Sequence, residues 1–330
     1  MSSHTVHISE RMSQASELIG GRLHAGQIRI HEKSVAEPPF SLLSINMEIS
    51  ANIGSGTYLW TYFTEHVSNI GRYCSIAHGT RLGDFDHPID RISTSEFTFR
   101  NDWIWKNFPD LIEESILDRA PLASSKKILI GNDVWIGAQT FIKNGVSLGD
   151  GCIVASNSVV TKDVPPYAIV AGNPAQIVKF RFDDRVIENL LNLPWHTYPY
   201  TYLRGANLSD INETIEFIEK INTEKLKKIP QLNLLRYVKY LEKNHDQIIN
   251  TKISLAEVIE NCAPDSDVKF DKIIGIGSAL EMAFKQKAEA QHKSQEVALR
   301  LDSVESTLHQ TSERFNNFAE DQAKFFERET

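Results

Sequence analysis

The chain has 330 residues, of which 41% are hydrophobic and 24% charged, a balance typical of globular proteins rather than disordered or fibrous ones. The formal net charge of −8 disfavours a protein that binds the phosphate backbone of nucleic acid. No apolar run approaches the roughly 20 residues of a membrane span, and the start lacks the pattern of a signal peptide. We therefore expect no transmembrane segment and a cytoplasmic location.

Residues 1–44 show no regular repeat and are expected to form an N-terminal extension. After them, aliphatic residues recur at every sixth position. The spacing occurs first at Ile53, then at Ile70, Ile76 and Leu82, and then without a gap at Ile130, Ile136, Ile142, Leu148, Val154 and Val160. Compact residues stand four places after most of these positions, and turn formers such as Asn144 and Gly145 lie between them.

A helix would show a period of 3.6 and a simple strand a period of 2, so a period of six requires a short strand followed by a bend, repeated. This pattern predicts a parallel β-helix over residues 45–182, with three strands in each coil of about 18 residues. Only compact side chains fit inside so narrow a prism, and Asn or Gly at its corners accepts the left-handed conformation at low cost.

The repeat stops between its two runs. Asp86, His87 and Pro88 follow Leu82, and the regular spacing resumes only after about forty residues, so we expect a loop over about 84–127. Loops of this length are uncommon in compact domains unless they have a function. We interpret this one as a lid or substrate loop.

Helical patterns follow the repeat. Asp183 is a candidate N-cap for a helix carrying Val186, Ile187 and Leu190, and Ser254 with Glu257 forms a capping box before another, within a helical segment expected over 183–270. Apolar or small residues then alternate by three and four from Leu280 to Phe325, which predicts a coiled coil over 271–330.

Several segments resemble the left-handed β-helix acyltransferases of the hexapeptide-repeat family, specifically the xenobiotic or chloramphenicol type and the relatives that O-acetylate polysaccharides. They are the hexapeptides themselves and the stretches IGRYCSIAHGTRLGDFDHP, NDVWIGAQTFI, SVVTKDVPPYAIVAGNPAQIVKFRF and VIENLLNLPWHTYP. The resemblance covers roughly residues 45–200. It implies left-handed winding, an active homotrimer, and acetyl-CoA bound in a groove between neighbouring prisms.

The resemblance also implies the roles of individual residues. His87 is the implied catalytic base and Trp135 the implied lining of the groove near it. The stretch of Ala171, Gly172, Asn173 and Pro174, together with Arg181, matches the portion that contacts coenzyme A.

Transfer of an acetyl group from a thioester to a hydroxyl needs a base, and histidine titrates near neutrality. Asp84, Asp86 and Glu96 are candidates to orient His87 or to bind acceptor hydroxyls, with simple solvation as the alternative. The loop also carries several aromatic residues, which form either a wall that stacks on a sugar or only the core of the loop itself. They are Phe97, Phe99, Trp103, Trp105 and Phe108.

Three cysteines, Cys74, Cys152 and Cys262, lie far apart without a CxxC pair, so we expect neither disulfides nor a cysteine zinc site. Cys74 and Cys152 stand at compact inward positions and should be inert, which favours direct transfer over a covalent cysteine intermediate. A histidine zinc site of the γ-carbonic anhydrase type lacks its required histidine pair, so no metal is expected.

The parts of the chain outside the resemblance favour a carbohydrate over an antibiotic as the acceptor. We therefore expect an acetyl-CoA-dependent O-acetyltransferase that acts on a sugar hydroxyl of a surface polysaccharide. Two alternatives stay open: N-acylation of an amino-sugar nucleotide, and a catalytically silent scaffold. The coiled coil also has two interpretations: it extends the trimer, or it binds a glycan-assembly protein.

Overall fold

The structure is a computed structural model, and the residues it describes lie in one compact unit of the chain, Met1–Leu280. The described residues are 3–44, 47–61, 64, 66–84, 86–95, 98–99, 126–193, 195–221, 226, 229–250, 253 and 255–264. The coiled coil predicted over 271–330 lies outside the described residues.

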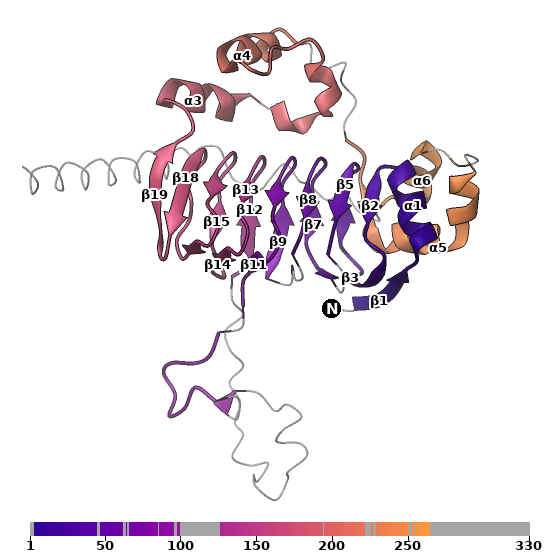
Figure 1. The fold of residues 1–330 in the computed structure, drawn as a ribbon, viewed down its shortest axis with the longest axis horizontal. Coiled ribbons are helices and arrows are strands. Elements are labelled where there is room, and N and C mark those ends of the chain that lie inside the picture. Colours follow the sequence, from indigo (N-terminus) through magenta and orange to yellow (C-terminus); the bar gives the residue numbers. More distant parts are fainter. Residues whose placement is uncertain are drawn as a thin grey trace, which may run out of the picture. The chain divides into compact units, whose positions relative to one another are not determined.

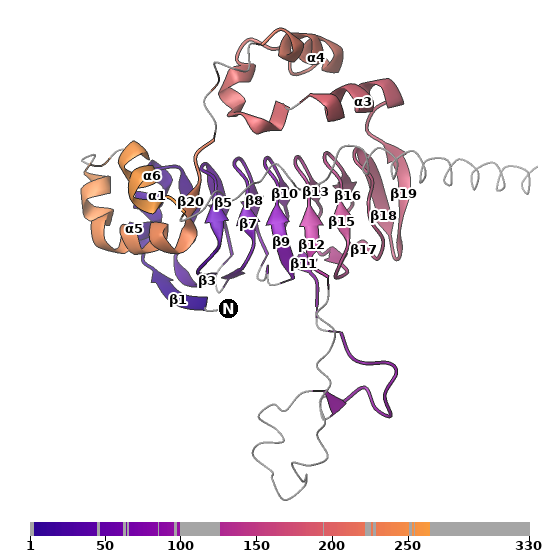
Figure 2. The ribbon, with the colours of Figure 1, turned by 180° about the vertical axis from the view of Figure 1, so that it is seen from behind.

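The strands wind into a β-helix with three faces, seen from two sides in Figures 1 and 2. In each coil the chain passes from the first face to the second and then to the third. Strands of successive coils pair in parallel, as in Ser75↔Trp135 and Ile136↔Val154. The parallel β-helix predicted from the period of six is therefore confirmed.

The first face holds eight strands in the spatial order β19-β18-β16-β13-β10-β8-β5-β2. Parallel pairing runs through it except at the end, where β18 and β19 form an antiparallel hairpin. The strands are β2 (Gly21–Leu23), β5 (Phe40–Leu42), β8 (Tyr58–Leu59), β10 (Ser75–Ile76), β13 (Trp135–Ile136), β16 (Ile153–Val154), β18 (Ala168–Gly172) and β19 (Ala175–Phe180).

The other two faces follow in winding order. Within the described residues, the second face holds two three-stranded sheets: β1 (Ser3–Ile8), β3 (Gly26–His31) and β6 (Met47–Ile49), then β11 (Arg81–Leu82), β14 (Phe141–Ile142) and β17 (Val159–Val160). The third face contains β4 (Val35–Ala36), β7 (Asn52–Ile53), β9 (Val67–Ile70), β12 (Ile128–Ile130), β15 (Ser147–Leu148) and the antiparallel β20 (Leu232–Asn233).

The interior matches the predicted pattern. Every aliphatic residue of the period-six runs, from Ile53 to Val160, is at most 2% exposed. At the compact positions, Thr57 Oγ1 donates to the Gly71 carbonyl and Thr140 Oγ1 to the Gly137 carbonyl, each at 2.7 Å. These hydroxyls satisfy carbonyls at the bends, where a buried acceptor would otherwise lack a partner.

The β-helix begins earlier than predicted. β2 to β5 already pair within it, so the ladder starts near residue 21 and not at residue 45, and residues 1–44 are not a separate extension. The period of six does not reveal these coils, because β3 is six residues long and Pro38-Pro39 occupies a bend. The N-terminal boundary from the sequence is corrected accordingly.

Helices cover the end of the stack formed by the first coil (Figures 1 and 2). α1 (Glu10–Leu18) packs against α5 (Leu234–Ile249), which packs in turn against α6 (Leu255–Cys262). Tyr237 of α5 is fully buried, and its hydroxyl lies 3.0 Å from Ser16 Oγ of α1. These helices protect the strand edges of the first coil, as terminal caps do in repeat proteins.

The segment predicted as helical over 183–270 thus has two parts. The second part contributes α5 and α6 to the cap just described. The first contains α3 (Asp184–Asn192), the short 3₁₀ turns η4 (Trp195–Thr197) and η5 (Tyr200–Leu203), and α4 (Ile211–Glu219). Asp183 accepts from the Val186 amide at 2.9 Å, which confirms the predicted N-cap.

Candidate active site

His87 stands where the chain leaves the second face after β11. Its Nδ1 lies 2.7 Å from the Thr94 carbonyl oxygen, and its ring meets the edge of Phe99 at 5.4 Å between centroids and 83° between planes. Phe99 is buried, whereas the imidazole is exposed. The described part of the loop therefore holds the ring through Nδ1, at a position where the imidazole is exposed.

The contact with Thr94 also determines which nitrogen can act as a base. A carbonyl oxygen only accepts hydrogen bonds, so Nδ1 must carry the proton in that bond. In the neutral ring, Nε2 is then the unprotonated nitrogen. Its lone pair is available to take a proton from an acceptor hydroxyl, the arrangement required of a general base.

The acidic residues before His87 have partners other than its ring. Asp84 forms an ion pair with Arg81, and its backbone carbonyl accepts from Asn144 Nδ2. The Asp86 carboxylate lies 3.5 Å from the same Asn144 nitrogen. The suggested orientation of His87 by these two carboxylates remains a prediction.

The remaining residues suggested for the acceptor fall largely outside the described part of the chain. Glu96, Phe97, Trp103, Trp105 and Phe108 all lie there, so their roles stay predictions. Phe99 is described, and its contact with His87 shows that it belongs to the packing of the loop.

Trp135 lies on the first face and is 53% exposed. In the ladder it neighbours Ser75, and Ser75 neighbours Tyr58, which is itself 41% exposed. Trp60 is similarly exposed and meets His78 edge-on at 5.6 Å. The face thus carries aromatic side chains on both sides of a small serine.

Sequence reasoning singled out Trp135 but missed Tyr58 and Trp60. The signal was present in the stretch TYLW, where both aromatic residues flank the inward Leu59. Residues on either side of an inward position point outward in a strand, so two large aromatic residues there are unusual for a solvated face.

The stretch expected to contact coenzyme A forms the exposed tip of the β18–β19 hairpin. Ala171 and Gly172 end β18, Gly172 pairs with Ala175, and the Asn173–Pro174 peptide bond is cis. Gly172 has a φ of +104°, which disfavours other residues, and its amide donates to Ser158 Oγ at 3.2 Å.

Arg181 has a structural set of contacts. Its Nη1 donates to Asp133 Oδ2 at 2.7 Å and to the Gly151 carbonyl at 2.8 Å, and its guanidinium lies over the rings of Tyr167 and Phe182. Burial raises the pKa of Asp133, and Arg181 opposes that shift. The predicted contact with coenzyme A stays a prediction, since this guanidinium already bridges two bends and the end of the hairpin.

The buried cysteines are unsuited to nucleophilic catalysis. All three are free and buried. Cys74 Sγ lies 3.1 Å from the Gly131 carbonyl, and burial raises the pKa of this thiol to about 12. Burial also raises the pKa of Cys152 well above its ordinary value. Because the thiolate is the nucleophile, both thiols are inert at neutral pH, as predicted.

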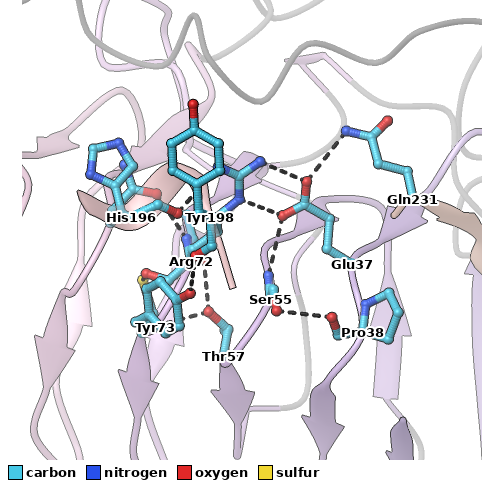
Figure 3. A network of polar contacts seen from close by, with 12 residues as sticks. Glu37, Pro38, Ser55, Thr57, Arg72, Tyr73, His196, Tyr198 and Gln231 are labelled. Carbon is cyan, nitrogen blue, oxygen red and sulfur yellow. Dashed lines mark hydrogen bonds and ion pairs between the residues drawn. The ribbon is translucent and has the colours of Figure 1, made fainter. Parts of the chain in front are cut away.

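A buried ion pair holds the segment that returns from the hairpin toward the cap (Figure 3). Glu37 receives Arg72 Nε at 2.6 Å and Nη2 at 2.9 Å, and also the side-chain amide of Gln231 at 3.3 Å. Arg72 Nη1 donates to the His196 carbonyl at 3.3 Å. The pair therefore contacts the returning segment at two places, His196 and Gln231.

Tyr73 adds to this attachment. Its hydroxyl donates to the Tyr198 carbonyl at 2.7 Å, and its ring stacks on Trp195 at 5.6 Å with a 20° interplanar angle. Burial raises the pKa of Tyr73 to about 12, so the hydroxyl stays a donor at neutral pH.

Two features are absent from the described residues. Within them, no group of three or more His, Cys, Asp or Glu side chains is arranged to hold a metal ion. Over the same part of the chain, no helix combines the length and the apolar character that crossing a membrane requires.

Comparisons with known proteins support the six-residue repeat. The bacterial transferase hexapeptide family, defined by six repeats, matches residues 127–162. A chloramphenicol acetyltransferase of Agrobacterium fabrum is 39% identical over 140 residues, which cover 42% of this chain and 63% of that protein. A probable macrolide acetyltransferase of Lysinibacillus sphaericus is 41% identical over 128 residues, or 38% and 67% of the two chains.

A galactoside O-acetyltransferase of Escherichia coli is 28% identical over 179 residues, which cover 54% of this chain and 71% of that protein. A solved galactoside acetyltransferase in complex with coenzyme A has 26% identity and a TM-score of 0.27, over 47% of this chain and 70% of that one. The matches thus span about two thirds of the length of these relatives and about half of this chain or less.

Proposed function

Because the chain belongs to the bacterial hexapeptide-repeat acyltransferase family, we propose that it transfers the acetyl group of acetyl-CoA to a hydroxyl of a carbohydrate. The observation that carries this proposal is the geometry of His87. Its Nδ1 bonds to the Thr94 carbonyl, which makes Nε2 the unprotonated nitrogen of the neutral ring, at an exposed position.

The proposed reaction is direct. Nε2 of His87 takes the hydroxyl proton as the acceptor oxygen attacks the thioester carbonyl, which gives a tetrahedral intermediate. When the carbon–sulfur bond breaks, the coenzyme A thiolate leaves and receives the proton from the imidazolium. The products are the acetyl ester and free coenzyme A, and His87 returns to its starting form.

We propose that the active unit is a homotrimer in which neighbouring copies complete each site. His87 follows a strand of the second face, whereas Trp135 and the hairpin of Gly172 belong to the first face. Near His87, Ile89 is 93% and Ile92 is 99% exposed. A contact between two different faces closes into a ring in a cyclic oligomer, and it would cover these apolar side chains.

The first face fits the proposed binding of both substrates. Trp135 and the exposed hairpin would line the groove for acetyl-CoA. Tyr58 and Trp60 offer flat apolar surfaces of the kind that pack against the C–H faces of a sugar ring. The similarity to a galactoside O-acetyltransferase supports a carbohydrate acceptor, and we propose a surface polysaccharide or its precursor. Acetyl-CoA as donor favours a cytoplasmic site of action.

The test uses the purified full chain with acetyl-CoA and separate acceptors: a galactoside, an amino-sugar nucleotide and chloramphenicol. Release of the coenzyme A thiol is followed in a colorimetric assay, and each product is then treated with mild alkali. An alkali-labile acetyl group on the sugar supports the proposal. An alkali-stable acetamide would instead identify an N-acyltransferase, and preference for chloramphenicol would overturn the carbohydrate assignment. Absence of acetyl-CoA binding by calorimetry would favour a scaffold.

A further inference from the structure

Both ends of the long loop rest on one bend of the next coil, formed by Asn144 and Gly145. At the departing end, a Cβ built on Gly83 would lie 2.2 Å from Asn144 Oδ1. At the returning end, a Cβ built on Gly145 would lie 3.1 Å from the Cβ of Lys126. The bend therefore contacts both the beginning and the end of the loop that carries His87.

Asn144 makes the specific contacts at the departing end. Its Nδ2 donates to the Asp84 carbonyl and lies 3.5 Å from an Asp86 carboxylate oxygen. One side-chain amide thus bridges two positions within three residues of His87. Asn144 is partly buried, and its bond to the Asp84 carbonyl is therefore partly shielded from competing water.

Gly83 and His66 pack closely together where the loop begins and ends. Gly83 has a φ of +82°, and a Cβ there would also lie 2.4 Å from the Cβ of His66. The Ile128 amide, where the loop returns, donates to the His66 carbonyl at 2.7 Å. The neck of the loop is closely packed, and Asn144 contacts the segment leading to His87 there, alongside the ion pair between Arg81 and Asp84.

We propose that Asn144 is a positioning residue, which holds the Asp84–Asp86 segment and thereby sets the place and orientation of the His87 imidazole. This inference rests on the proposed function, because it assigns Asn144 a role in the reaction of His87. Asn144 contacts the chain beside the base and not the base itself, so it acts on the geometry of proton transfer.

The positioning role predicts a specific kinetic pattern. Asn144→Ala removes the donor, and Asn144→Asp replaces it with a carboxylate next to Asp86. A displacement of a base by about 1 Å costs on the order of 100-fold in rate, so both variants should lose about 10-fold to 100-fold in kcat. The KM for acetyl-CoA should change less than about twofold, since the proposed groove lies on the first face.

The matched control is Asn52→Ala. Asn52 is also an asparagine of the β-helix that bonds to the backbone, here by accepting from the Val35 amide at 3.3 Å. Its strand, β7, is separated by β9 from β12, where the loop returns. The control variant should lose a similar amount of thermal stability as Asn144→Ala without losing turnover. Equal loss of kcat in the two variants would show that Asn144 has a structural role only.

A readout independent of any acceptor comes from NMR of the isotope-labelled imidazole nitrogens in the full chain. In the native protein at a pH where the ring is neutral, His87 should hold its proton on Nδ1. In Asn144→Ala, the signals should shift toward exchange between the two tautomers, because the bond to Thr94 is no longer held in place. Unchanged His87 signals in that variant would overturn the positioning role.

A double substitution separates this inference from the function on which it rests. If Asn144 acts through His87, adding Asn144→Ala to His87→Ala should cause no further loss of turnover. If His87→Ala itself retains full turnover, the proposed function fails, while the tautomer measurement still decides whether Asn144 positions the ring. An additive loss in the double variant, with His87 essential, would contradict action through His87.

Discussion

Arg72 and Glu37 bind each other through two parallel hydrogen bonds across two coils of the β-helix, with side chains only 7% and 0% exposed. Both charges are removed from water, so each depends on the other for its compensation. The pair also contacts the returning segment through His196 and Gln231. It therefore joins the β-helix to the chain that leads to the cap.

The first prediction concerns this pair. Glu37→Gln and Arg72→Met should each lower the free energy of unfolding by about 3 kcal/mol, because each leaves one buried charge without its partner. The double substitution should cost less than the sum of the two. Urea denaturation of the full chain measures all three values. Single variants within about 0.5 kcal/mol of the native protein would show that the pair is solvated in solution.

A second prediction follows from the raised pKa values of Cys74 and Tyr73. Burial raises the pKa of each to about 12, so the folded chain keeps these protons to higher pH than the unfolded chain does. The stabilisation is fully present below pH 9 and is lost as the pH rises toward 12. Urea titrations at increasing alkaline pH should show this decline.

The native Cys74 thiol should also resist alkylation by iodoacetamide at pH 8, and Cys74→Ser should retain turnover. Rapid alkylation of the folded protein, or loss of activity in Cys74→Ser without unfolding, would instead point to a covalent cysteine intermediate.

A third prediction separates the two roles considered for Arg181. Because its guanidinium binds Asp133 and the Gly151 carbonyl, Arg181→Met should lower the free energy of unfolding by about 1 to 3 kcal/mol. Lys179→Met, at an exposed position of β19 two residues before Arg181, is the control. Calorimetry with coenzyme A then tests the phosphate contact: a loss of affinity in Arg181→Met greater than in Lys179→Met indicates that Arg181 also binds the coenzyme.

A fourth prediction concerns the heptads from Leu280 to Phe325, which lie outside the described residues. A coiled coil joined to a cyclic oligomer is most easily accommodated when strand number and subunit number agree, so we expect a parallel trimer. Removal of residues 275–330 should leave a catalytically competent trimer of lower thermal stability, or one that no longer binds a glycan-assembly protein. Light scattering showing a dimeric full chain would contradict this.

The coils that could be predicted from the sequence are those in which the same short strand and bend recur every six residues. Ile130 and its period-six successors are inward because each position repeats the same bend and strand, which needs no knowledge of distant contacts. The first coils were missed because their longer strands hide the period. The contact of Ser16 with Tyr237 joins residues 221 positions apart, and no local pattern encodes it.

In the candidate site, too, local features could be predicted from the sequence and distant contacts could not. His87 could be singled out because it stands where the repeat breaks, a feature visible in the sequence. Its hydrogen bond to Thr94, and the bond from Asn144 to Asp84, depend on how the loop folds back on the next coil. Likewise, the pairing of Arg181 with Asp133 requires the β18–β19 hairpin to lie beside a bend 48 residues earlier.

The central claim is that His87 is the general base of an acetyl transfer from acetyl-CoA. Its most direct test is the turnover of His87→Ala in the full chain, with the acceptor that gives an acetyl ester and with coenzyme A binding measured in parallel. The account predicts a loss of about 100-fold to 10,000-fold in kcat, with an intact oligomer and nearly unchanged affinity for coenzyme A. Turnover close to that of the native enzyme would contradict it.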